Sequence, residues 1–209
     1  MPSKRPENLQ LRALLKERLE ALKIRPSPEF LEGTISFWEL FRKEAPSLGL
    51  TAHQPFDAFL RPVTEALFLA RQLPPKARCV DLGAGAGIPG LLVKLARPDL
   101  QLTLIEAVDK RVVFMNQAIA ALGLKDVRAV CCHIGFKPCE VRAPLAIGRG
   151  YGAVDKFVRH AFFFFRARKA FYLFRHQVEK WRPATLPLFL KAEIPLPGGQ
   201  TSLLVFESA

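Results

Sequence analysis

The residues best placed to do chemistry lie in the stretch CVDLGAGAGIPG, from Cys79 to Gly90. It places one carboxylate, Asp81, just ahead of glycines at positions 83, 85, 87 and 90. Glycine lets a backbone turn sharply and lie close against a ligand, where a β-carbon would be in the way. A short apolar run precedes the glycines and a helical apolar pattern follows them, which is typical of the opening strand–turn–helix unit of a Rossmann-like domain.

The glycine spacing leaves two classes of ligand open. Gly85, Gly87 and Gly90 also satisfy the GxGxxG pattern of dinucleotide-binding proteins. Asp81 argues against a dinucleotide, because a carboxylate at the mouth of the loop would repel a pyrophosphate across poorly screened space. The same carboxylate would attract the ammonium group of S-adenosylmethionine. We therefore interpret the loop as a methyl-donor site, in preference to a dinucleotide site or a glycine turn without a ligand.

A second acid closes the next apolar run. Glu106 ends the segment LQLTLIE, one strand and one helix after the glycine loop. A carboxylate at this strand end can accept hydrogen bonds from both hydroxyls of a ribose, a contact common to both classes of ligand.

The chain is strongly basic. Its 209 residues include 31 Lys and Arg against 19 Asp and Glu, a net charge of +12. Such a balance attracts polyanions, so we expect nucleic acid as a partner, although small proteins can be basic without one. With no run of 18 apolar residues and no secretory signal, we expect a soluble cytoplasmic monomer without a membrane contact. The four cysteines contain no CxxC pair, so we expect reduced thiols and no metal.

Helical patterns fill the first third of the chain. They predict helices up to about residue 23, over 28–43 with Ser27 as N-cap, and over 55–72 with a kink or restart at Pro62. We expect residues 1–73 to form a helical cap within the same compact unit as a Rossmann-like core over 74–209.

From Arg78 onward, strands and helices alternate. The patterns predict strands at 79–82, 101–106, 127–131, 145–148 and 170–174, with helices over 88–96, 109–122 and 153–168 between them. A closing pair, 186–194 and 201–206, is joined by the turn residues Pro197-Gly198-Gly199 and predicts an antiparallel hairpin at the sheet edge. The fold class is therefore α/β, a mostly parallel sheet ending in a hairpin, which is the S-adenosylmethionine-dependent methyltransferase arrangement.

Three segments resemble one family. VDLGAGAGIPG, RPDLQLTLIEAVDKRVVFM and GRGYGAVDKFV are similar to the bacterial small-subunit (16S) ribosomal RNA guanine-N7 methyltransferases, the glucose-inhibited division protein B family, from about Gly49 to Phe206. The resemblance implies a methyl donor, S-adenosylmethionine, and a guanine in a loop of 16S ribosomal RNA (the 530 loop, nucleotide 527) in naked RNA or the small subunit. It also implies donor contacts at Gly83, Ile88, Ile134, Gly135 and Arg149. With the pattern-based candidates, the full donor set is Asp81, Gly83, Ala84, Gly85, Gly87, Ile88, Glu106, His133, Ile134, Gly135 and Arg149.

The chain departs from the family pattern at four positions. Gly135 stands where the family has an acid, Pro62 and Glu65 replace the histidine and aspartate of a cap-helix run, and Arg175 replaces a lysine. Arginine is not a neutral substitute for lysine, because its planar guanidinium has a different hydrogen-bonding geometry. These departures motivate a second hypothesis, a non-catalytic RNA-binding relic of the fold; a third is a small-molecule methyltransferase.

Methyl transfer to guanine N7 asks little of side chains. N7 carries a lone pair at neutral pH, so no general base is needed, and the rate comes from positioning. In A-form RNA this edge faces a groove that side chains cannot read, so the substrate must be an open loop with a splayed base. Positioning candidates are Arg149, Arg175 and Tyr151, the last as a base-stacking residue or, alternatively, a buried aromatic. Arg149 is expected to pair with the methionine carboxylate, with a surface ion pair as the alternative.

Overall fold

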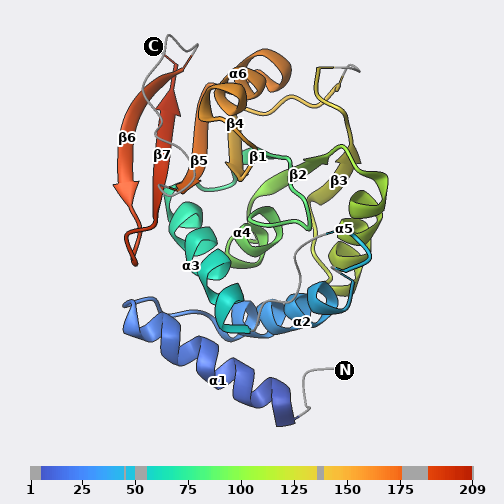
Figure 1. Cartoon of the computed structure of the whole chain (residues 1–209), viewed down its shortest axis with the longest axis vertical. Coiled ribbons are helices and arrows are strands. Elements are labelled where there is room, and N and C mark those ends of the chain that lie inside the picture. Colours follow the sequence, from blue (N-terminus) through green and yellow to red (C-terminus); the bar gives the residue numbers. More distant parts are fainter. Residues whose placement is uncertain (1–5, 45, 50–55, 136–138, 176–187, 209) are drawn as a thin grey trace.

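A seven-stranded sheet forms the centre of the protein (Figure 1). The computed structural model describes the chain except residues 1–5, 45, 50–55, 136–138, 176–187 and 209, and only the backbone of 174 and 175. The strands are β1 (Arg78–Leu82), β2 (Gln101–Glu106), β3 (Val127–Cys131), β4 (Leu145–Arg149), β5 (Lys169–Arg175), β6 (Phe189–Pro195) and β7 (Thr201–Glu207).

The strand order confirms the predicted fold class. The sheet runs β3-β2-β1-β4-β5-β7-β6 from one edge to the other. The first five strands are parallel, whereas β7 is antiparallel to β5 and β6 is antiparallel to β7. The β6–β7 hairpin therefore lies at one edge, as the sequence predicted. Because Thr201 pairs with Arg175, the hairpin turn lies at the carboxyl end of β5.

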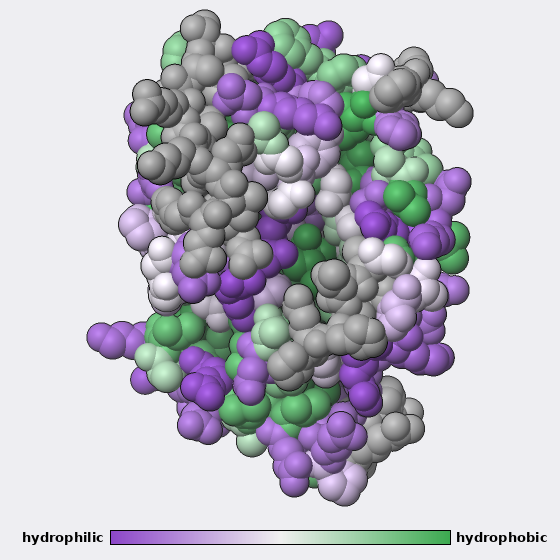
Figure 2. All heavy atoms as spheres, viewed as in Figure 1, coloured by the Kyte–Doolittle hydropathy of each residue, from purple (hydrophilic) through white to green (hydrophobic). Residues whose placement is uncertain are grey.

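The helices cover both faces of the sheet (Figure 1). They are α1 (Pro6–Ala21), α2 (Pro28–Glu44), α3 (Phe56–Gln72), α4 (Gly90–Ala96), α5 (Asp109–Ala121) and α6 (Val154–Phe165). The N-terminal helices lie on the same side as α4 and α5, and α6 packs on the opposite face against β1, β4 and β5. On the face shown in Figure 2, hydrophilic residues predominate, and apolar residues show mainly around the N-terminal helices.

The structure tests the predicted N-cap of α2 and the predicted break at Pro62 in α3. Ser27 does cap α2, because the Phe30 N–H donates to its Oγ at 3.2 Å. Of the kink or restart expected at Pro62, the restart is wrong, since α3 runs through this residue as one helix, and the kink stays a prediction. Proline removes only one backbone hydrogen bond, and Pro62 is buried among the apolar residues of α3. Packing of that apolar face holds the helix together across the missing bond.

Alternation along the strands divides the buried residues into two clusters. In β1, Cys79 belongs to the cluster that includes the N-terminal helices, and Val80 and Leu82 belong to the cluster beneath α6. Successive strand residues point to opposite faces, which produces this division. The first cluster is continuous from Leu15 in α1 to Val205 in β7. It contains a group of rings on α2 and α3, in which Phe59 lies 4.9 Å from Trp38 and 6.0 Å from Phe41 between centroids.

This continuity predicts that the N-terminal helices and the sheet unfold together. Phe59 is 2% exposed, so Phe59→Ala should lower the free energy of unfolding by about 3–5 kcal/mol, through lost burial and a cavity. Phe163→Ala, at a 53% exposed ring, is the matched control and should cost far less. Calorimetry should show one transition for both variants. Two separate transitions, with only one shifted by Phe59→Ala, would contradict a continuous core.

Candidate functional site

The glycine loop between β1 and α4 is packed tightly on both sides. A β-carbon at Gly83 (φ +67°) would lie 2.6 Å from Cδ2 of Tyr151, and one at Gly90 would lie 2.3 Å from Cδ2 of Leu104. These close approaches explain why glycine is needed at both ends of the loop. The loop is thereby held against the strand ends, where a ligand in a Rossmann-like fold binds.

Asp81 lies beneath this loop. Its residue exposure is 0%, and its Oδ2 accepts the Gly90 N–H at 2.9 Å, at the start of α4. Its Oδ1 is buried with no hydrogen-bond partner among the described residues. Burial raises the pKa of Asp81 to about 7; the Gly90 hydrogen bond partly opposes this, and the charge of Glu106 adds to it. The expected contact of Asp81 with the donor ammonium stays a prediction, and its immediate role is to hold the loop to α4.

Glu106 faces a pocket at the end of β2. Its Oε2 accepts the Gly85 N–H at 2.9 Å, and its Oε1 accepts the N–H groups of Ala107 and Val108 at 2.9 and 3.0 Å. Arg111 lies 3.8 Å from Oε1. The carboxylate therefore connects the glycine loop to the end of β2 and keeps a fixed position at the pocket wall.

The pocket beside Glu106 has a volume of about 250 Å³. Five of the sequence-predicted residues line it, namely Gly83, Glu106, His133, Ile134 and Tyr151. Sequence reasoning missed five further lining residues: Ile105, Ala107, Cys132, Lys156 and His160. The first three directly neighbour predicted positions, so the strand ends themselves were a usable signal. Lys156 and His160 come from α6; Lys156 lies within the segment GRGYGAVDKFV that resembles the family, whereas His160 lies in no such segment. We call this cavity the donor pocket.

Tyr151 closes one side of the donor pocket. Its hydroxyl lies 2.7 Å from Nδ1 of His160, and Lys156 Nζ lies 5.6 Å from its ring centroid. Burial raises the pKa of Tyr151 to about 12, and burial, with the charge of Lys156, lowers the pKa of His160. At neutral pH the phenol therefore stays protonated and shares a hydrogen bond with the imidazole, whose tautomer decides which group donates. The ring also meets Phe157 edge-on at 6.2 Å, so Tyr151 is packed between β4 and α6, and its stacking role stays a prediction.

Arg149 has a protein partner on the other face of the sheet. Its Nε donates to Oε2 of Glu65 in α3 at 2.6 Å, and Thr201 Oγ1 of β7 donates to Oε1 at 2.8 Å. Glu65 is 2% exposed, so this is a buried carboxylate that joins the N-terminal helices to two strands. The sequence interpretations of Arg149 were a donor carboxylate and a surface ion pair; the contact is an ion pair, but with a buried carboxylate rather than at the surface. Pairing of Arg149 with the donor stays a prediction. It requires the guanidinium to bind both Glu65 and the donor carboxylate.

The remaining predicted residues lie outside the pocket lining. Ala84, Gly85, Gly87 and Ile88 form the turn itself. Gly135 has φ +92° and is exposed, so an acidic side chain there would be strained, which accounts for glycine in place of the acid. The side chain of Arg175 lies outside the described residues.

Two absences concern the described residues only. Among them, no group of three or more His, Cys, Asp or Glu side chains is arranged to hold a metal ion. None of the helices that the structure describes has the length and apolar character needed to cross a membrane.

The buried Asp81 predicts an unusual pH dependence of stability. In the unfolded chain this carboxyl ionises near pH 3.8, whereas in the folded protein it ionises near pH 7. Unfolding therefore releases a proton between these values, and stability falls as the pH rises through this window. Asn does not titrate, so Asp81→Asn should gain stability relative to the unaltered chain between pH 4 and 8, by up to about 4 kcal/mol.

Denaturant unfolding at several pH values measures this effect. Asp99→Asn is the matched control, because Arg97 holds the pKa of Asp99 well below its usual range and its effect should be nearly constant above pH 5. A stability difference for Asp81→Asn that does not change with pH would show that the carboxyl is ionised in the folded state.

Comparisons with known proteins agree on one family. The family model described as GidB, rRNA small subunit methyltransferase G, matches residues 32–185. A protein named ribosomal RNA small subunit methyltransferase G from Moorella thermoacetica is 48% identical over 64 residues, 31% of this chain and 27% of that one. A protein of the same name from Dichelobacter nodosus is 27% identical over 146 residues, 69% of each chain. The matches to the proteins from Moorella thermoacetica, Acidothermus cellulolyticus and Frankia casuarinae span 27%, 44% and 46% of their lengths.

Solved structures support the fold. A SAM-dependent methyltransferase from Aquifex aeolicus superimposes with a TM-score of 0.54 at 11% identity, covering 71% of this chain and 92% of that one. The mitomycin 7-O-methyltransferase MmcR gives a TM-score of 0.56 at 16% identity, covering 99% of this chain and 70% of that one. The family model covers residues 32–185, most of the chain, and the solved methyltransferases share its fold. The chain belongs to the GidB family, rRNA small subunit methyltransferase G.

Proposed function

We propose that the protein is an S-adenosylmethionine-dependent methyltransferase. The observation that carries the proposal is Glu106, a carboxylate on the wall of the donor pocket, fixed by three backbone N–H groups beside the glycine loop. A ribose diol needs such an acceptor at the end of the second strand. The unpartnered Oδ1 of Asp81 is a second, buried polar atom at the end of β1, beneath the same loop.

We infer that the substrate is a guanine in 16S ribosomal RNA, methylated at N7. The printed names of the family and its relatives support ribosomal RNA, and the net charge of +12 supports a polyanionic partner. A ribosomal substrate, as naked RNA or small subunit, supports a cytoplasmic location. N7 bears its own lone pair, so the reaction needs no general base. The donor pocket fits this, because Glu106 is the one carboxylate among the described residues of its lining.

The contribution of the protein to such a reaction is positional. S-adenosylmethionine, when bound, supplies a methyl group on a positively charged sulfur. Glu106 would hold the ribose, Ile134 and His133 would border the adenine, and Tyr151 would fix the wall nearest β4. Holding the reacting atoms in line removes much of the entropic part of the barrier, so no acid or base is required.

Donor binding tests the pocket assignment. Titration by calorimetry should show saturable binding of S-adenosylmethionine, and Glu106→Gln should weaken it about ten- to a hundredfold, because hydrogen bonds to a charged acceptor are lost. Glu140→Gln, at an exposed acid, should leave affinity unchanged. A melting curve for each variant checks the fold. Equal affinities for Glu106→Gln and the unaltered chain would show that Glu106 does not contact the ribose.

Ribosomal RNA from cells tests the reaction. Cells lacking the gene should lose one N7-methylguanine from 16S ribosomal RNA, and the unaltered gene should restore it. An unchanged methylation pattern together with retained RNA affinity would instead favour the non-catalytic RNA-binding protein, the alternative motivated by the departures at Pro62, Glu65, Gly135 and Arg175.

A further inference from the structure

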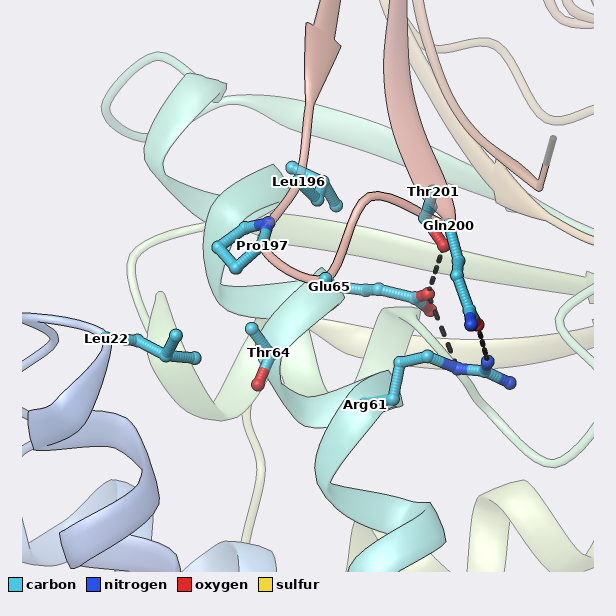
Figure 3. A pocket seen from close by; sticks show the side chains of 9 residues that line it. Leu22, Arg61, Thr64, Glu65, Leu196, Pro197, Gln200 and Thr201 are labelled. Atoms are coloured by element: carbon cyan, nitrogen blue, oxygen red, sulfur yellow. Dashed lines mark hydrogen bonds and ion pairs between the residues drawn. The ribbon is translucent and has the colours of Figure 1, made fainter.

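A second pocket lies between α3, the end of α1 and the β6–β7 turn (Figure 3). Its volume is about 410 Å³, within the range of small-molecule sites. Leu22, Leu196 and Pro197 supply apolar walls, and the polar side chains are those of Arg61, Thr64, Glu65, Gln200 and Thr201. Nothing in the donor assignment uses this pocket.

The pocket lies at the carboxyl ends of the parallel strands, as the donor pocket does. Thr201, at its wall, pairs with Arg175 at the carboxyl end of β5, and Glu65 contacts Arg149 at the carboxyl end of β4. Two residues after Arg149, Tyr151 lines the donor pocket. Two residues of extended chain span about 7 Å. A short stretch of β4 and its following loop therefore connects the walls of the two pockets.

The guanidinium of Arg61 is held in place before any ligand binds. Its Nη1 donates to Oε1 of Gln200 at 3.3 Å, and its Nε lies 3.8 Å from Oε1 of Glu65 (Figure 3). Glu65 is buried, and the Arg61 side chain is 42% exposed. A preorganised, planar and partly exposed cation provides a surface on which a flat ring can stack.

The charges of the pocket favour a base over a phosphate. Arg61 is the single cationic side chain in the described lining, and the carboxylate of Glu65 lies directly beside it. A phosphate would meet this carboxylate, whereas an uncharged base would not. Single-stranded RNA is recognised by splaying bases out, stacking them on aromatic or arginine planes and hydrogen-bonding their edges. Apolar walls, one guanidinium and one amide match those requirements.

We propose that this pocket takes an unstacked base of the substrate RNA, next to the base that is methylated. The proposal rests on the proposed function, because it takes ribosomal RNA as the substrate. Arg61 stacks on the base, the amide of Gln200 hydrogen-bonds its edge, and Leu22, Leu196 and Pro197 exclude water. The site thereby holds the RNA open beside the donor pocket.

RNA affinity of variants tests the proposal. The probe is a fluorescently labelled fragment of 16S ribosomal RNA, measured by anisotropy without donor. Gln200→Ala removes the amide, and Thr64→Trp fills the pocket from α3; each should weaken binding about tenfold. Gln72→Ala, at an exposed glutamine on the last turn of the same helix, is the matched control and should leave affinity unchanged. Melting curves confirm that each variant is folded.

Salt dependence separates a base from a phosphate. Arg61→Ala should weaken RNA binding with an unchanged dependence of affinity on salt, because stacking releases no counterion. A salt slope reduced by about one charge would identify a phosphate contact and overturn the base assignment. Unchanged affinity in both Gln200→Ala and Thr64→Trp would overturn the site itself.

The outcomes for this site and for the proposed function are distinguishable. If the unaltered chain binds donor and methylates RNA while these variants bind RNA normally, only this site is wrong. If RNA affinity depends on Gln200 and Thr64 but no methylation occurs, the site stands and the enzymatic function is wrong.

Discussion

A buried carboxylate in α3, Glu65, connects the helical cap to the carboxyl ends of the parallel strands, where the candidate sites lie. Its two oxygens accept hydrogen bonds from Arg149 of β4 and Thr201 of β7. Removing one partner of such a buried pair leaves an uncompensated charge, which typically costs about 3–5 kcal/mol. The position of α3 against the strand ends, and with it the pocket beneath the β6–β7 turn, depends on this contact. Glutamate in place of the family's aspartate keeps the negative charge and lengthens the side chain by one methylene.

The division of the core into two clusters decides what each strand-end residue can do. Asp81 and Arg149 share the face that carries Cys79 and Ile147, so they point toward α4 and α3, beneath the N-terminal helices. The donor pocket takes its other wall from Tyr151, Lys156 and His160, which lie on the side of α6. A ligand at Glu106 would therefore lie between the face that carries Asp81 and Arg149 and the face that carries Tyr151, Lys156 and His160. The glycine loop lies at the boundary, which explains why it is packed from both directions.

Much of the fold was predictable, because alternation and turn residues are local signals. The strand at 101–106 and the capped start of α2 were predicted to the residue, and the hairpin followed from Pro197-Gly198-Gly199. The inward direction of Asp81 could also have been inferred, since it is two residues from buried Cys79 on a strand. The pairing of Glu65 with Arg149 could not, because 84 residues separate them and no local pattern links the two. The same holds for Lys156 and His160, which reach the donor pocket only once α6 is packed on the sheet.

The coupling between Glu65 and Arg149 tests most directly whether this pair joins the helical cap to the carboxyl ends of the strands. The measurement is the free energy of unfolding of Glu65→Ala, of Arg149→Ala and of the double variant, compared with the unaltered chain. Each single change should leave a partly buried charge without its partner, so the double variant should lose less stability than the sum of the two single losses, by about 1–3 kcal/mol. Strictly additive losses would contradict the account, because they would show that the two side chains stabilise the protein independently of each other.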